Sequence, residues 1–184
     1  MPPKQEIVAS LYGAWRLMRL DPTGMTYFNL SADGFWRSFF AAVIIAPFYV
    51  VLSYIQFADK GEARAALVAL DFVGYCVGWA AFPVAMLFIA RFLQRADRYA
   101  GFIIAMNWIA VLHWVIVMVV FTLYQVLPRG PALLLYFGLV GGLLLYDFYV
   151  ARVALGVGPG HAIAIAVIGF LMALLIDFTV LGFV

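Results

Sequence analysis

The sequence predicts an all-α membrane protein, a five-transmembrane-helix bundle with an N-terminal amphipathic interfacial helix. Apolar residues make up 67% of the 184 residues and charged residues only 11%. A soluble domain is nearer half apolar, so this composition excludes one. From residue 39 onward the chain consists of five apolar runs. Each run is close to or above the ~20 residues that a helix needs to cross ~30 Å of hydrocarbon.

The five runs are joined by short connections. Polar interruptions inside them are single residues in long apolar stretches, which membrane insertion tolerates. We therefore divide the chain into a head, residues 1–34, and a membrane domain, residues 35–184. The predicted spans are residues 39–57, 65–92, 101–127, 131–154 and 161–184.

Lysine and arginine are unevenly distributed around these spans. With five spans, the head and the second and fourth connections lie on one side and carry eight of these residues, against three on the other side. The positive-inside rule therefore predicts a cytoplasmic amino terminus and a carboxyl terminus outside. The head has no short apolar segment with a cleavage site, so we expect the first span to stay as an anchor. Compact loops and the composition favour a bacterial inner membrane.

Residues 5–20 form the one segment outside the spans with helical periodicity. Trp15 beside Arg16 and Arg19 suits a helix in the cytoplasmic interface, where anionic headgroups attract it. The alternatives are that its apolar face docks on the ends of the spans or binds a partner protein. That apolar face is predicted to contain Ile7, Val8, Leu11, Ala14, Trp15 and Met18, opposite Glu6, Ser10, Gly13 and Arg16.

Carboxylates inside the spans are the positions where function is sought first, because burying a charge in hydrocarbon costs at least a few kcal/mol. With a rise of about 1.5 Å per residue, Asp71 and Asp177 both fall roughly 6 to 9 Å below the outer surface. Asp147 falls near the inner surface, at about the level of Asn107. We therefore expect an outer carboxylate pair and an inner Asp/Asn pair.

Two chemical roles are open for these residues. A close carboxylate pair holds a proton or binds a cation, as a proton- or cation-linked transporter requires. Alternatively, each aspartate snorkels to its interface or hydrogen-bonds a neighbouring helix, with Arg91 and Arg152 near Asp147 to neutralise it. His113, about 18 Å from the cytoplasmic side, is a candidate proton carrier or a polar tie between helices.

Small and aromatic residues predict how the helices pack. Gly74 with Gly78, and Gly138 with Gly142, form GxxxG pairs that let helix backbones approach closely. Prolines inside the first and second spans predict kinks. Aromatic belts are expected near the ends of spans. Residues assigned to them include Tyr54, Tyr124, Tyr136, Tyr146, Tyr149 and Trp36.

Enzymatic constellations are not found in the sequence. It contains no HExxH, Walker or G-x-S-x-G motif, and two histidines are too few for a histidine-box di-iron site. The predicted depths of His113 and His161 differ too much for a shared haem, and a metal site is poorly supplied. With such short loops there is no room for a catalytic domain outside the membrane. We expect no enzyme, no cofactor and no metal.

The order of a short head and five closely spaced spans resembles the YIP family of membrane proteins. The aromatic approach from Phe28 to Phe39, Pro47 in the first span, and Gly74-Tyr75 in the second are similar to features of bacterial members. Asp33-Gly34-Phe35 departs from the Asp-Leu-Tyr-Gly-Pro signature of eukaryotic members, so the resemblance does not extend to binding of Rab-type GTPases. It implies a non-enzymatic membrane protein that associates with other membrane components.

These observations predict an interaction or scaffold component, or an accessory subunit of a membrane complex. The alternative is a small proton- or cation-linked transporter or channel that uses the intramembrane aspartates and His113. We expect the partners to be the lipid bilayer and either other membrane proteins or further copies of the chain, and no nucleic acid.

Overall fold

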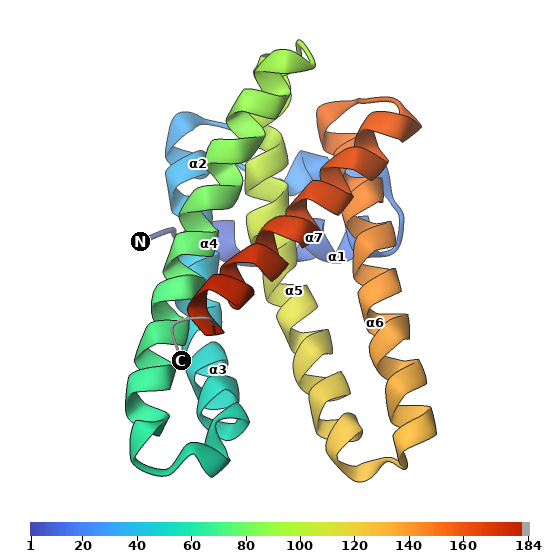
Figure 1. Ribbon diagram of the computed structural model, residues 1–184. Coiled ribbons are helices and arrows are strands. Elements are labelled where there is room, and N and C mark those ends of the chain that lie inside the picture. Colours follow the sequence, from blue (N-terminus) through green and yellow to red (C-terminus); the bar gives the residue numbers. More distant parts are fainter. Residues whose placement is uncertain (182–184) are drawn as a thin grey trace.

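The computed structural model describes residues 1–181, and every long element in it is an α-helix (Figure 1). Five of its helical segments are long and apolar enough to cross a membrane, with mean hydropathies of 1.8 to 2.4 in their most apolar stretches. A shorter helix precedes them near the amino terminus. The predicted fold class, five apolar spanning helices after a short N-terminal helix, is confirmed.

The helices begin and end close to the predicted residues. The last three residues of the predicted fifth span lie outside the described residues. The prolines of the first two spans lie inside helices that continue past them. The elements are α1 Lys4–Met18, η1 Pro22–Tyr27, α2 Ala32–Ser38, α3 Phe40–Gln56, η2 Ala58–Ala63, α4 Arg64–Phe92, η3 Ala96–Arg98, α5 Tyr99–Val126, α6 Arg129–Val150, η4 Ala151–Leu155 and α7 Pro159–Leu181.

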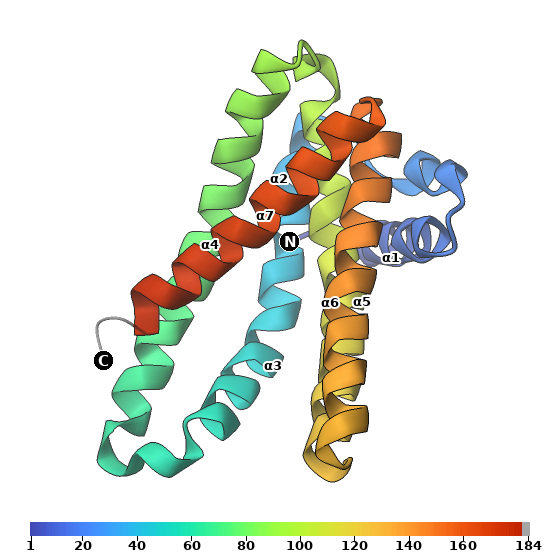
Figure 2. The same cartoon turned by 45° about the vertical axis from the view of Figure 1, so that its right-hand side comes forward.

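Two helical hairpins and one crossing helix make up the membrane part. The hairpins α3–α4 and α5–α6 spread apart toward the end that holds their connections (Figures 1 and 2). Helix α7 runs obliquely across both hairpins and packs on α4 and α6. It ends before reaching the level of the α3–α4 and α5–α6 connections (Figure 2). The inclination of α7 therefore sets how deep its side chains lie.

The core lies toward the other end of the bundle, around the first half of α5. Phe102, Ile103, Ile104, Trp108 and Ile109 are each exposed by 1% or less. They pack with residues of α1, α4, the α6–η4 segment and the start of α7. The half of the bundle nearer the hairpin connections has few buried residues, as expected of helices whose neighbours are lipid chains.

Helix α1 lies across the outside of α5 and α6, on the side opposite α7 (Figures 1 and 2). Its buried residues are Ser10, Gly13, Ala14 and Leu17. Of the predicted apolar face, Ala14 is buried and Ile7, Leu11 and Met18 pack partly buried against the core, whereas Val8 and Trp15 are exposed. The buried face also includes Ser10 and Gly13, which the periodicity assigns to the polar side. Trp15 remains 49% exposed. Helix α1 therefore packs on the spanning helices, and an exposed aromatic surface is left on its outer side.

Polar contacts fix the turn that follows α1. The Arg16 guanidinium donates to Oδ2 of Asp21 at 2.7 Å and to the Tyr27 hydroxyl at 3.0 Å. The side chain of Thr23 also donates to Asp21. Hydrogen bonds from Thr23 first and from Arg16 second lower the pKa of Asp21. Hydrogen bonds to Asp21 first and to Tyr27 second raise the pKa of Arg16. Both side chains therefore stay charged, and the turn stays closed, around neutral pH.

Two glycines make this packing possible. A Cβ added to Gly24 would lie 2.5 Å from the carbonyl oxygen of Gly13 and 2.9 Å from the backbone nitrogen of Leu17. Backbone atoms cannot move aside as the end of a flexible side chain can. We therefore expect Gly24→Ala to destabilise the docking of α1 by about 1–3 kcal/mol, measured as faster hydrogen exchange of the α1 amides in nanodiscs.

Gly141→Ala is the matched control for this substitution, because a Cβ at Gly141 meets nothing within 4 Å. Unchanged exchange of α1 in Gly24→Ala, or an equal change in both variants, would contradict the close contact between η1 and α1.

Candidate functional site

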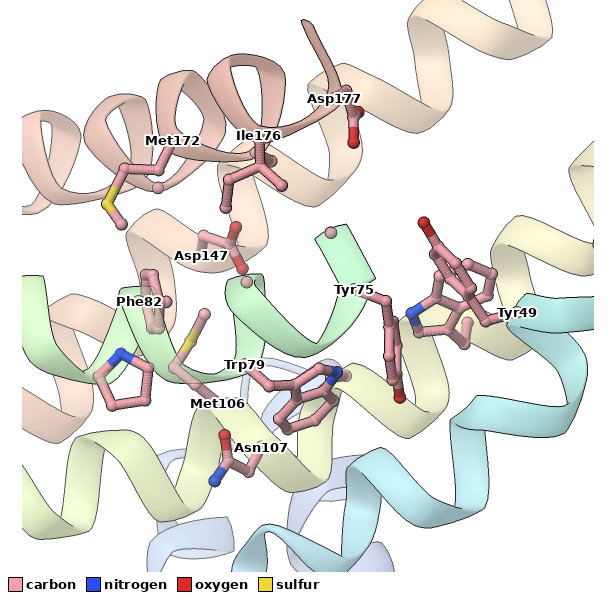
Figure 3. Close-up of a pocket in the computed structure, with 17 residues that line it drawn as sticks. Tyr49, Tyr75, Trp79, Phe82, Met106, Asn107, Asp147, Met172, Ile176 and Asp177 are labelled. Carbon is pink, nitrogen blue, oxygen red and sulfur yellow. The ribbon is translucent and has the colours of Figure 1, made fainter. Parts of the chain in front are cut away.

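A cavity of about 330 Å³ lies where α7 crosses the two hairpins (Figure 3). Residues from α3, α4, α5, α6 and α7 line it, so it exists only because these helices meet. Two carboxylates, Asp147 of α6 and Asp177 of α7, belong to its lining together with Asn107 of α5. The residues that line the cavity therefore come from both hairpins and from α7.

Aromatic rings line the cavity from α3, α4 and α5. Tyr49 is at the centre of this group, with ring centroids 4.5 Å from Tyr75 and 5.4 Å from Trp114. Trp79 meets Tyr75 edge-on at 6.1 Å. All four residues contribute to the lining. We call Tyr49, Tyr75, Trp79 and Trp114 the aromatic wall.

Hydrogen bonds hold both tyrosines of the wall in place. The Tyr75 hydroxyl donates to the carbonyl oxygen of Ala42 at 2.6 Å. The Tyr49 hydroxyl donates to the carbonyl oxygen of Asp71 at 3.4 Å. Because both hydroxyls are bonded to backbone, the tyrosines offer the cavity their rings rather than a free donor.

Asp147 has no charge partner within the described chain. Its Oδ1 atom is buried and has no hydrogen-bond partner. Neither Arg91 nor Arg152 forms an ion pair with it, so the expected neutralisation by these arginines is wrong. All ion pairs found among residues 1–181 lie within residues 1–38. A carboxylate is therefore held inside the bundle without a cation from the chain.

The expected inner pair, Asp147 and Asn107, lines one cavity, and Asp177 of the expected outer pair lines it too. Asp71 lies outside the lining. Asp71 is still near enough for its charge to interact with that of Asp177. The depth arithmetic treats every helix as perpendicular to the membrane. The inclined α7 instead carries Asp177 across α4 into the cavity (Figures 1 and 3).

Asn107 has a second, structural contact. Its Nδ2 donates to Oγ of Ser38 at 2.8 Å, and the Ser38 hydroxyl in turn donates to the carbonyl oxygen of Phe35 at 2.7 Å. This chain of hydrogen bonds ties α5 to α2 and fixes the orientation of the amide beside the cavity. The amide oxygen of Asn107 takes no part in these hydrogen bonds.

His113 is not brought to the carboxylates. It does not belong to the cavity lining, and its ring lies edge-on to Tyr146 with centroids 5.1 Å apart. Its Nε2 atom is buried without a hydrogen-bond partner. Tyr146, expected in an aromatic belt, is buried instead and donates from its hydroxyl to the carbonyl oxygen of Ala14 at 3.3 Å.

The two GxxxG pairs have different surroundings. Gly74 and Gly78 face the cavity beside α7, where a Cβ on Gly78 would lie 3.8 Å from Cδ1 of Ile176. A Cβ on Gly138 or Gly142 of α6 would meet nothing within 4 Å. The packing role of the second pair thus stays a prediction about contacts beyond this chain.

Sequence analysis does not predict the aromatic wall. A signal for it exists in α4, where Tyr75 and Trp79 stand one helical turn apart in the middle of a span, away from the ends where belts are expected. The contribution of Trp114 depends on how α3 meets α5, which no local pattern in the sequence indicates.

Comparison with protein-family models, with curated proteins and with solved structures finds no match for this chain. The resemblance to the YIP family therefore stays a prediction from the sequence, and the function is argued from the site itself.

Proposed function

We propose that the chain is a small cation-linked membrane transporter or channel, with Asp147 and Asp177 as its cation-binding groups. The observation that carries this proposal is the buried Oδ1 of Asp147, which has no hydrogen-bond partner and belongs to a cavity with a second carboxylate. The proposal adopts the alternative reading of the sequence, and it is supported by two of the predicted ionisable residues, Asp147 and Asp177, in the lining of one cavity.

The energetics of buried charge support this role. A carboxylate inside hydrocarbon is stable only when it is protonated or faces a positive charge. The head has its own ion pairs, such as Arg37 with Glu6 at 3.0 Å. Among residues 1–181, no basic side chain forms an ion pair with either cavity carboxylate. A proton or cation from outside the chain completes the site.

The orientation belongs to the same proposal. The excess of lysine and arginine in the head and the even-numbered connections supports a cytoplasmic amino terminus in a bacterial inner membrane.

The test is cation entry into proteoliposomes. An inside-negative potential drives protons, sodium or tetramethylammonium into vesicles that hold the purified chain. We expect at least one of these cations to enter faster than into empty vesicles. Asp147→Asn and Asp177→Asn should each slow that entry about tenfold or more, because losing a charged partner costs about 1.5 kcal/mol or more.

Asp33→Asn is the matched control, because the Asp33 side chain lies on α2 and is 81% exposed. It should keep the entry rate of the unmodified protein. Entry no faster than into empty vesicles, or entry unchanged in both cavity variants, would refute the proposal.

A second candidate function is that of a scaffold or accessory subunit, which the outer face of α6 favours. Gly138, Gly141 and Gly142 have no neighbour within 4 Å of an added Cβ, and small residues are enriched where transmembrane helices pack. The resemblance to the YIP family supports the same role.

This second candidate predicts a particle heavier than the 20.4 kDa chain after extraction into native nanodiscs. Replacing Gly138 and Gly142 together by leucine should release the single chain, since bulky side chains prevent close helix approach. A particle that contains one chain and nothing else, measured by mass photometry or native mass spectrometry, contradicts a subunit role.

A further inference from the structure

We infer that the cavity binds a compact organic cation, a protonated amine or a quaternary ammonium group that carries an apolar part. This inference deepens the proposed function and rests on it, since both use Asp147 and Asp177. It names the class of cation from the presence of two carboxylates and the aromatic wall in the lining of one cavity.

The charge of the ligand follows from the two carboxylates. Asp147 stands on α6 and Asp177 on α7, and both belong to the lining (Figure 3). Oδ1 of Asp147 is buried without a hydrogen-bond partner. An ionised Asp147 would stay uncompensated beside a neutral ligand and would repel an anion, so a positive ligand is the one that stabilises the ionised site.

The aromatic wall selects an organic cation. Tryptophan and tyrosine rings attract an ammonium group within about 6 Å of the ring centre, and sets of such rings recognise quaternary ammonium ligands. The hydroxyls of Tyr49 and Tyr75 are already bonded to backbone carbonyl oxygens. The two tyrosines therefore offer ring surface to the ligand, as do Trp79 and Trp114, the other members of the aromatic wall.

The same surroundings disfavour a metal ion. Calcium is held by about 6–8 oxygen ligands and magnesium by near-octahedral oxygen sets. Among residues 1–181, no group of three or more His, Cys, Asp or Glu side chains is placed to hold a metal ion. Rings, methionines and glycines make up most of the remaining lining, and they provide few oxygen ligands.

The size of the cavity separates an organic cation from a proton. A space of about 330 Å³ admits a small organic molecule, whereas proton transfer requires only a chain of hydrogen-bonding groups. His113, the other titratable side chain predicted to carry a proton, lies outside the lining. A ligand with an apolar part beside its charge explains both the volume of the cavity and its aromatic lining.

The test is calorimetric binding of phenyltrimethylammonium to the full chain in nanodiscs, with empty nanodiscs as the blank. Its neutral counterpart is tert-butylbenzene, in which carbon replaces the charged nitrogen in the same shape. We expect the cation to bind and the neutral molecule to bind at least tenfold more weakly. Equal binding of the two molecules, or no binding of the cation, would overturn the inference without any variant having to fold.

Variants then assign the binding to named residues. Trp79→Leu should weaken binding of the cation about five- to thirtyfold, as expected for loss of one cation–π contact. Asp147→Asn should weaken it about tenfold or more. Trp36→Leu, on the exposed surface of α2, should leave binding unchanged. Equal affinity in all three variants would overturn the assignment to this cavity.

Lipid headgroups and free solutes both provide ammonium cations. Nanodiscs of phosphatidylglycerol diluted with phosphatidylethanolamine are compared with discs diluted to the same extent by an uncharged glycolipid. Weaker binding in the first discs identifies headgroups as competing ligands, and equal binding identifies a free cation; both results support the ammonium class. Binding of the cation without cation entry would refute the transport proposal alone, and entry of sodium or protons without binding would refute this inference alone.

Discussion

The architecture of the site depends on one close crossing, that of α7 over α4. A Cβ on Gly169 would lie 3.3 Å from Cε2 of Phe82, and a Cβ on Gly78 would lie 3.8 Å from Cδ1 of Ile176. The first of these contacts is tight, so the missing side chain of Gly169 helps α7 to run closely across α4 on its oblique path from α6 (Figures 1 and 2). The crossing covers the space between the hairpins and carries Asp177 to the cavity that Asp147 lines from the other hairpin.

Charged side chains have different surroundings in residues 1–38 and in the cavity between the spans. In residues 1–38 each ion pair is made within the chain, and Arg16 with Asp21 closes a turn that lies outside the spans. Exposed pairs of this kind contribute little to stability but fix local geometry. In the cavity, Oδ1 of Asp147 has no partner although burial makes an unpaired charge far more costly there. Such a cost is expected where a ligand supplies the missing charge, as at a binding site.

Features that depend on local composition could be predicted from the sequence, and features that depend on helix direction could not. Span length and hydropathy follow from the residues of each run alone, so the helices lie close to the predicted bounds. The buried face of α1 includes Gly13, whose lack of a side chain matters only once η1 packs against it, because an added Cβ would lie 2.7 Å from the carbonyl oxygen of Gly24. The depth of Asp177 depends on the inclination of α7, which packing against α4 and α6 sets. Tyr146 matches a belt by position, yet the docked α1 buries it.

The central claim is that α7 crosses α4 closely enough to bring the two carboxylates to one cavity. The most direct measurement is cross-linking of Gly78→Cys with Ile176→Cys in native membranes by dibromobimane, which fluoresces after it joins two nearby thiols. Replacing Cys76, the one cysteine of the sequence, by serine removes the competing thiol. The account predicts strong fluorescence for this pair and none for Gly138→Cys with Ile176→Cys, whose first position has no neighbour within 4 Å. Equal fluorescence of the two pairs, or none for the first, would contradict it.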